Sequence, residues 1–202
     1  LLNMLQPRIK FDLTDMVGSL MYIDSKFYVN GIGIVISGTV KGSDIKLNDK
    51  LWIGPIKGKF IPIRVKSIHN NSREHVPELK NEQYGCIALK FISKDTFNKQ
   101  QLKKGVIAFS DEKFKNSVVR TFKANIKILH HSTTISNNYQ AVIHTGQVRQ
   151  AATLKILDDL DYLRTGDNAK VEFTFISYPE YVEKGNTIFF RDGSTKGFGT
   201  II

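Results

Sequence analysis

The sequence predicts an all-β protein made of two small antiparallel β-barrels. Short runs of β-branched and aromatic residues, such as "GIVISGTV" and "FIPIRVKSIH", are separated by turn sequences such as "KGSD" and "LNDK". A second set of similar runs follows a polar stretch from Ser110 to Ser117. Barrels remove the unpaired edges of short strands, although the periodicity alone is also compatible with paired sheets.

The chain opens with an expected helix end. Leu1, Leu2 and Leu5 are spaced like one apolar face of a helix, and Pro7 disfavours helix at the residue before it. We therefore assign residues 1–15 to a helix end and a linker, residues 16–112 to a first barrel and residues 118–202 to a second.

One strand of the second barrel shows the alternation clearly. In "VEFTFI", Val171, Phe173 and Phe175 fall on one face and Glu172 and Thr174 on the other. The first face is predicted to be core.

The densest glycine stretch, "NGIGIVISGTVKG", is not a nucleotide site. Ile36 stands where the third glycine of a dinucleotide fingerprint belongs, and Thr39 stands where a phosphate loop needs lysine. We expect Gly31 and Gly33 to form a tight turn, Gly38 to allow close approach and Gly42 to end the strand.

The charge balance favours a polyanionic partner. The net charge is +10, and seven basic residues but no acidic one lie between Lys113 and Leu157. From Asp158 onward, eight acidic residues outnumber five basic ones. This segregation favours one basic face.

Other classes of function lack their motifs. No apolar run is long enough to span a membrane, no secretory signal is present, and no His, Cys, Asp or Glu cluster has metal-ligand spacing. No nucleophile-elbow or paired-carboxylate motif appears. We expect a cytoplasmic, monomeric binding module with no catalytic, cofactor or metal residue of its own.

The order of motifs resembles the translational GTPases of the elongation factor Tu and elongation factor 1-alpha superfamily. "FYVNGIGIVISGTVKGSDIKLNDKLWIGP" resembles the start of their domain II, and "IFFRDGSTKGFGTII" resembles the closing strands of their domain III. "ILHHSTTIS", "YQAVIHTGQVRQAATL" and "LRTGD" look most like the GTP-binding protein 1 branch. The resemblance implies Greek-key barrels, and a separate N-terminal GTPase domain that would bind GTP and Mg²⁺, hydrolyse GTP and pack on both barrels.

The resemblance also implies partners and sites. Its members carry aminoacyl-tRNA to the ribosome, and their domain II holds the aminoacylated 3′ end of tRNA. The corresponding positions here are Phe27, Val29, Gly31, Ser37, His69, Glu82, Gln83 and Ile87. Ile32 replaces a family arginine and His69 a family glutamate, which leaves the 3′-end ligand open.

Domain III of the family contacts the T-stem backbone of tRNA. Gln140, Arg149, Asp192 and Gly193 fall at these positions, and Ser194 replaces an arginine. Two alternatives to tRNA delivery remain: a ribosome-rescue or RNA-surveillance GTPase that binds a partner protein, and an interaction module without an RNA role.

Overall fold

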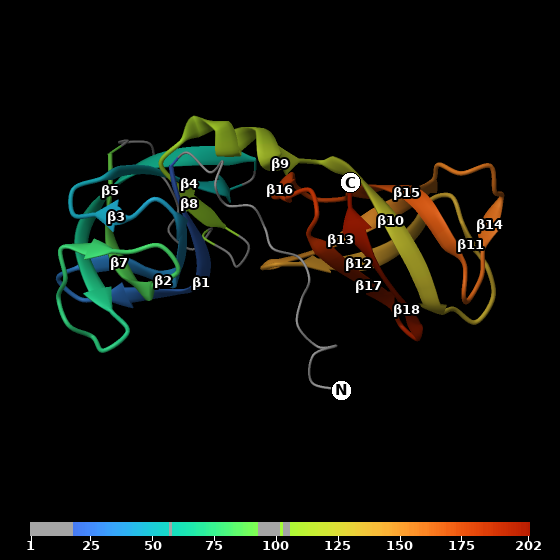
Figure 1. Cartoon of the computed structure of the whole chain (residues 1–202), viewed down its shortest axis with the longest axis horizontal. Coiled ribbons are helices and arrows are strands. Elements are labelled where there is room, and N and C mark those ends of the chain that lie inside the picture. The colour runs from blue at the N-terminus through green and yellow to red at the C-terminus, as the bar shows by residue number, and fades with distance from the viewer. Residues whose placement is uncertain (1–17, 57, 93–101, 103–105) are drawn as a thin grey trace.

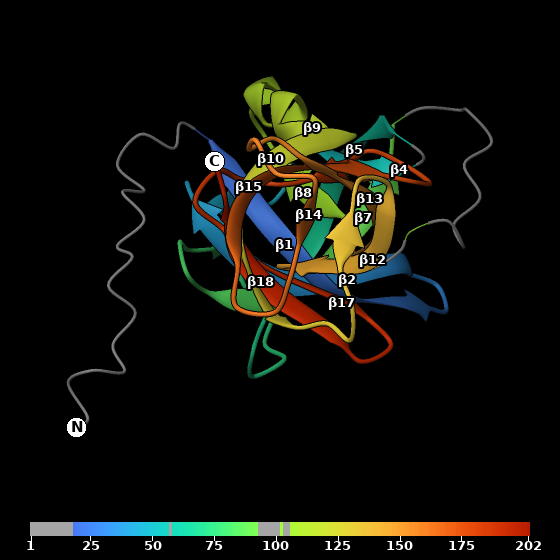
Figure 2. The same cartoon turned by 90° about the vertical axis from the view of Figure 1, so that its right-hand side faces the viewer.

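The structure is a computed structural model that describes residues 18–56, 58–92, 102 and 106–202. Two closed antiparallel barrels lie next to each other, joined by a short helical segment that runs along one side (Figures 1 and 2). The all-β prediction and the prediction of two barrels are confirmed. The helix end expected in residues 1–15 lies outside the described residues.

The first barrel has six strands in the order β1-β2-β7-β5-β4-β8. Non-consecutive neighbours such as β2 and β7 are the Greek-key feature of this order. The strands are β1 (Ser19–Val29), β2 (Gly33–Gly42), β4 (Lys50–Ile56), β5 (Lys59–Asn70), β7 (Tyr84–Phe91) and β8 (Ile107–Phe109). A small outer ladder pairs β3 (Ile45–Lys46) with β6 (Glu78–Leu79).

The second barrel repeats the closure in the order β10-β15-β13-β12-β17-β18. Its strands are β10 (Thr121–His130), β12 (Tyr139–Thr145), β13 (Val148–Ile156), β15 (Asn168–Phe175), β17 (Thr187–Asp192) and β18 (Thr195–Ile201). Two short ladders flank it, pairing β9 (Val118–Val119) with β16 (Glu180–Tyr181) and β11 (Ile135–Ser136) with β14 (Tyr162–Leu163).

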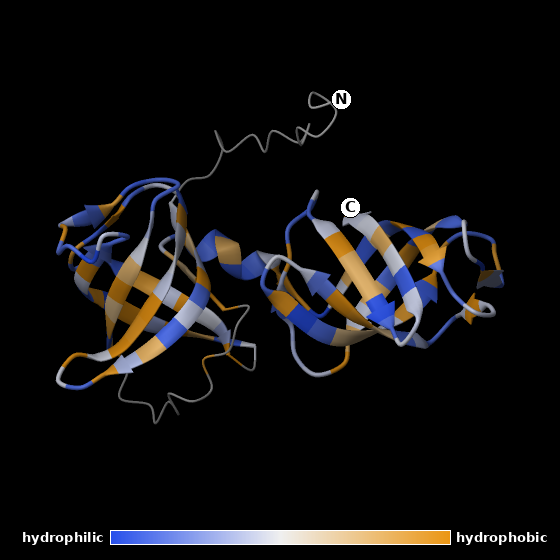
Figure 3. Cartoon of the chain, turned by 90° about the horizontal axis from the view of Figure 1, so that it is seen from below, coloured by the Kyte–Doolittle hydropathy of each residue, from blue (hydrophilic) through white to orange (hydrophobic). Residues whose placement is uncertain are grey.

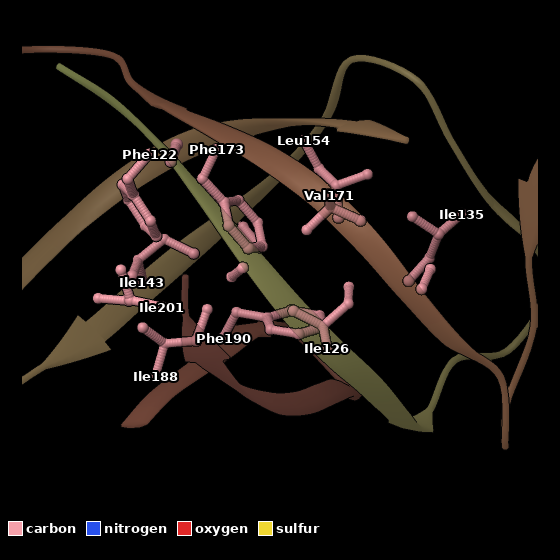
Figure 4. Close-up of a cluster of buried hydrophobic side chains, with 14 of the residues drawn as sticks. Phe122, Ile126, Ile135, Ile143, Leu154, Val171, Phe173, Ile188, Phe190 and Ile201 are labelled. Atoms are coloured by element: carbon pink, nitrogen blue, oxygen red, sulfur yellow. The ribbon is translucent and has the colours of Figure 1, made fainter. Parts of the chain in front are cut away.

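Alternating hydropathy along the strands fills each barrel with its own core (Figure 3). In β15, Val171, Phe173 and Phe175 are fully buried, as predicted, whereas Glu172 and Thr174 lie on the outer face. Phe173 packs between Phe122 and Phe190, with ring centroids 5.6 and 5.8 Å away (Figure 4).

The glycines after β1 allow backbone angles and close strand contacts that a side chain would prevent. Gly31 and Gly33 have φ angles of 78° and 106°, the left-handed region that favours glycine, and they turn the chain from β1 into β2. A Cβ atom at Gly38 would overlap the Tyr22 carbonyl oxygen, so this strand pair needs glycine to approach closely. Gly42, with φ of 77°, ends β2. The prediction that these residues shape a strand is confirmed.

A polar and aromatic seam joins the two barrels. The Tyr22 hydroxyl of the first barrel donates to both carboxylate oxygens of Glu183 in the second, at 2.9 and 3.0 Å, and the Tyr181 hydroxyl donates to the same carboxylate. Burial, reinforced by the Glu183 charge, raises the pKa of both tyrosines. Gln147 adds a hydrogen bond to Asp24 at 2.8 Å.

The connecting 3-10 helix, η4 (Glu112–Ser117), packs on the first barrel. The Lys115 ammonium lies 3.6 Å from the centre of the Trp52 ring, and Phe114 packs against Phe109. This packing fixes the path of the chain between the barrels.

Candidate nucleic-acid interface

The residues expected to hold the 3′ end of tRNA are spread along the first barrel. Phe27 and Val29 end β1 and Gly31 lies in the turn, next to the start of β2, whereas Glu82 and Gln83 pair their backbones with Val40 near the end of β2. Seven residues of extended strand separate Gly33 from Val40, which is roughly 23 Å at 3.3 Å per residue. The structure therefore places these residues in two groups.

Between these two groups, three residues lie opposite one another across three strands. Ser37 of β2 lies opposite Cys86 of β7, and Cys86 lies opposite His69 of β5. Ser37 is only 1% exposed, and its hydroxyl has no hydrogen-bond partner among the described residues. Ile87 belongs to the buried core cluster, so its side chain does not reach the surface.

The polar groups at the far end are already engaged. The Glu82 carboxylate accepts a hydrogen bond from the Lys41 ammonium at 3.1 Å, and the Gln83 side-chain oxygen accepts one from the Lys80 backbone at 2.9 Å. Lys41 meets only Oε1 of Glu82, whose side chain is 65% exposed, so a ligand amino group would share this carboxylate with Lys41. At the near end, Phe27 is 51% exposed and Ile32, which replaces the family arginine, is 40% exposed.

The residues expected to contact a T-stem lie on one outer surface of the second barrel. Gln140 of β12 points outward, and the neighbouring Tyr139 donates a hydrogen bond to Asp192 at 3.2 Å, which brings the turn at Asp192 and Gly193 close. Arg149 of β13 lies opposite His144 of β12. His144 is four residues further along β12 than Gln140, which is a distance of roughly 13 Å. The structure thus brings all four residues onto β12, β13 and the adjoining end of β17.

The pKa of His144 indicates that this surface is positively charged. Its pKa is lowered by burial and, in addition, by the positive charges of Arg191 and Arg149. Its Nε2 atom is buried and has no hydrogen-bond partner within the described part of the chain. Arg149 likewise forms no side-chain hydrogen bond or ion pair there. The surface therefore carries positive charge that is not neutralised from within.

His144 and Arg191 are additions to the residues expected from sequence. Both could have been found from strand alternation, since Ile143, Thr145 and Phe190 beside them point inward. What sequence did not provide was the register that places His144 beside Arg149 and near Arg191.

Two findings concern metal ligands and membrane spans in residues 18–56, 58–92, 102 and 106–202. No group of three or more His, Cys, Asp or Glu residues in these ranges could hold a metal ion. None of the helices formed there is long and apolar enough to cross a membrane.

Comparison with known proteins agrees with the architecture. The chain is 41% identical over 201 residues to GTP-binding protein 1 of Xenopus laevis, covering 99% of this chain and 29% of that protein. It is 34% identical over 180 residues to GTP-binding protein 2 of Mus musculus, covering 89% of this chain and 29% of that protein. Elongation factor 1-alpha of Thermofilum pendens is 25% identical over 170 residues, covering 84% of this chain and 35% of that protein.

No family model matches the chain. The chain spans about a third or less of the length of these curated relatives. Its identity to the GTP-binding proteins exceeds its identity to the elongation factor, and the two barrels are those expected for domains II and III of the superfamily. The identities and the two barrels together support a part of a translational GTPase, with greater similarity to GTP-binding proteins 1 and 2 than to elongation factor 1-alpha.

Proposed function

We propose that the two barrels bind tRNA and present aminoacyl-tRNA for GTP-dependent delivery to the ribosome. The observation that carries this proposal is the positive surface of the second barrel, where Arg149 of β13 has no side-chain partner among the described residues and Gln140 lies on the paired strand β12. Backbone recognition of an RNA duplex needs basic and polar donors of this kind rather than base readers.

The GTP-dependent step belongs to the whole protein. The relatives are named as GTP-binding proteins, and this chain spans less than a third of their length. We propose that GTP and Mg²⁺ bind a GTPase domain outside this chain, which would pack on both barrels and change their position in a cytoplasmic, monomeric protein. The chain itself would supply binding and no catalytic group.

The seam supports a two-barrel binding unit. Tyr22, Tyr181 and Glu183 link the barrels through hydrogen bonds, so a ligand held by one barrel would keep a defined relation to the other. Such a relation is useful for a ligand as long as tRNA, whose 3′ end and T-stem would meet different barrels.

Charge reversal tests the proposal. Arg149→Glu in the 202-residue chain should weaken binding of an acceptor and T-stem minihelix at least about fivefold, and should flatten the dependence of affinity on salt. Lys113→Glu makes the same charge change on the exposed linker and should have a much smaller effect. Equal affinities for the Arg149→Glu and Lys113→Glu variants would argue against the proposal.

A second candidate function rests on the first barrel. Phe27, Val29 and Ile32 are exposed together at the β1–β2 turn, as at a protein-binding site, and one oxygen of the Glu82 carboxylate is already bonded to Lys41. These features favour a ribosome-rescue or RNA-surveillance factor that binds a partner protein in place of aminoacyl-tRNA. In that case the minihelix would bind without regard to aminoacylation, and replacing Ile32 with Asp would abolish partner binding.

A further inference from the structure

The half of the second barrel away from β12 and β13 carries a second basic surface, which surrounds two exposed phenylalanines. Phe198 of β18 lies directly opposite Phe189 of β17, and their side chains are 38% and 58% exposed. Neighbouring strands lie about 4.8 Å apart, so the two side chains occupy adjacent positions on one outer face, which we call the aromatic platform. Neither phenylalanine belongs to the core of this barrel, to which β17 contributes Ile188 and Phe190 instead.

Local sequence explains why Phe198 points outward. It lies between Gly197 and Gly199, whose Cα atoms face inward at places where a Cβ would overlap the Phe190 ring and the Asn125 carbonyl oxygen. The two glycines let β18 approach its neighbours closely, and alternation then directs Phe198 to the outer face.

A groove of about 540 Å³ lies beside this platform, over β10, β15 and β18. Cross-strand pairing sets its side chains in two rows: Asn168, Lys127 and Phe198 form one, and Lys170, Asn125 and Thr200 form the other. Across three neighbouring strands, the groove is therefore lined by one aromatic ring, two ammonium groups and two side-chain amides.

The charge of the groove favours an anionic ligand. Lys127 and Lys170 form no side-chain hydrogen bond or ion pair with the described residues. The one acidic residue that lines the groove, Asp158, already accepts a hydrogen bond from the Lys170 backbone at 2.7 Å.

A third row on the same strands adds positive charge. Arg191 of β17 lies directly opposite Lys196 of β18, and like charges in this position repel each other. Asp192, the acidic residue next to them, accepts a hydrogen bond from Tyr139. A bound phosphate would relieve the repulsion between Arg191 and Lys196.

We propose that this surface binds single-stranded RNA. Unpaired bases stack on Phe198 and Phe189, phosphates lie against Lys127, Lys170 and the Arg191–Lys196 pair, and the Asn125 and Asn168 amides contact base edges or 2′-hydroxyls. The interior bases of a duplex are stacked on each other and offer no face to a phenylalanine, which favours unpaired RNA as the ligand of the platform. The groove lies on strands other than β12 and β13, and the two surfaces share only Arg191 of β17 and its neighbourhood. The inference goes beyond the proposed function because its ligand is unpaired RNA.

Substitutions at Phe198 test the proposal by separating stacking from simple apolar contact. With a short fluorescein-labelled single-stranded RNA as the probe and the 202-residue chain, Phe198→Ala should weaken binding about five- to a hundredfold, the effect of losing one stacked base. Phe198→Tyr should keep the affinity because it keeps the ring. Phe198→Leu should lose most of it, whereas a protein ligand would tolerate leucine.

Two controls make the result specific. Tyr162→Ala removes an aromatic side chain of similar exposure from β14 of the same barrel and should leave the affinity unchanged. The Phe198 variants should also bind the acceptor and T-stem minihelix as the unmodified chain does. The proposal is overturned if Phe198→Ala or Phe198→Leu binds single-stranded RNA as well as the unmodified chain, or if Phe198→Ala weakens both probes equally.

The two RNA proposals fail separately in this experiment. Binding of single-stranded RNA that depends on Phe198, without minihelix binding that depends on Arg149, would support the groove and overturn the tRNA proposal. The reverse pattern would overturn the groove alone.

Discussion

The main buried cluster of the first barrel, among the residues that the structure describes, consists of aliphatic residues such as Ile36, Ile63 and Ile68 together with Met21. The buried Phe109 of this barrel belongs to a separate cluster, which also contains Tyr181 of the second barrel. The second barrel closes the same number of strands around a phenylalanine cluster that includes Phe173 and Phe190. The same closure is therefore compatible with quite different side-chain volumes, as long as the inward positions alternate with outward ones.

The outer faces of the barrels differ as well. In the first barrel, Lys41 pairs with Glu82 and Lys46 with Glu78. In the second barrel, Arg149 and Lys127 find no such partner within the described ranges. Other first-barrel cations, such as Lys50 and Arg73, also form no side-chain ion pair within the described ranges, so the contrast holds for these positions only. An anion would meet open charge at Arg149 and Lys127 and paired charge at Lys41 and Lys46.

The largest effect is expected from the phenylalanine core. Phe173→Ala removes a fully buried ring between two others and should lower the free energy of unfolding of the second barrel by about 3–5 kcal/mol. Urea unfolding followed by circular dichroism reports both barrels, whereas fluorescence of Trp52, the single tryptophan, reports the first.

We expect the second barrel to unfold at lower urea in this variant, so the circular dichroism transition should precede the fluorescence transition. The milder Ile36→Val in the first barrel should cost about 0.5–1.5 kcal/mol and shift the fluorescence transition. If both probes shift together for Phe173→Ala, the two cores are one cooperative unit and the contrast between them does not extend to stability.

Strand alternation explains why the barrels could be predicted. "VEFTFI" identified Val171, Phe173 and Phe175 as core because each choice depends only on neighbours two residues away. The glycine turn at Gly31 and Gly33 was equally local.

The surface could not be predicted to the same depth, because it depends on register between distant strands. The pairing of Phe189 with Phe198, or of His144 with Arg149, follows from how closely each strand fits its neighbour in space. The ion pair between Lys41 and Glu82 joins residues 41 positions apart, and no local pattern in either segment indicates it. The structure therefore adds to the sequence mainly information about which outward side chains meet.

An intermediate effect is expected at the seam, where a second-barrel carboxylate satisfies a first-barrel tyrosine. Glu183→Ala removes the acceptor of the Tyr22 and Tyr181 hydroxyls, and leaving these partly buried donors without it should cost about 1–3 kcal/mol in all. Both the fluorescence and the circular dichroism transitions should move to lower urea. Glu183→Gln keeps one acceptor oxygen and should cost less.

Asp161→Ala, which removes an exposed carboxylate of the same barrel, provides the matched control for charge. If the Glu183→Ala and Asp161→Ala variants are equally stable, the seam contributes nothing to the free energy of unfolding. The stability of each barrel would then be independent of the other barrel.

The smallest effect is expected from the paired charges of the first barrel. The Lys41 and Glu82 side chains are 31% and 65% exposed, so Glu82→Gln should change the free energy of unfolding by less than about 0.5 kcal/mol. Because the proposed duplex contacts lie on the second barrel, minihelix affinity should also change less than about twofold, and Glu78→Gln should behave in the same way. A loss of discrimination between aminoacylated and free minihelix in Glu82→Gln alone would contradict this, because it would show that Glu82 leaves Lys41 to meet the amino group of the ligand.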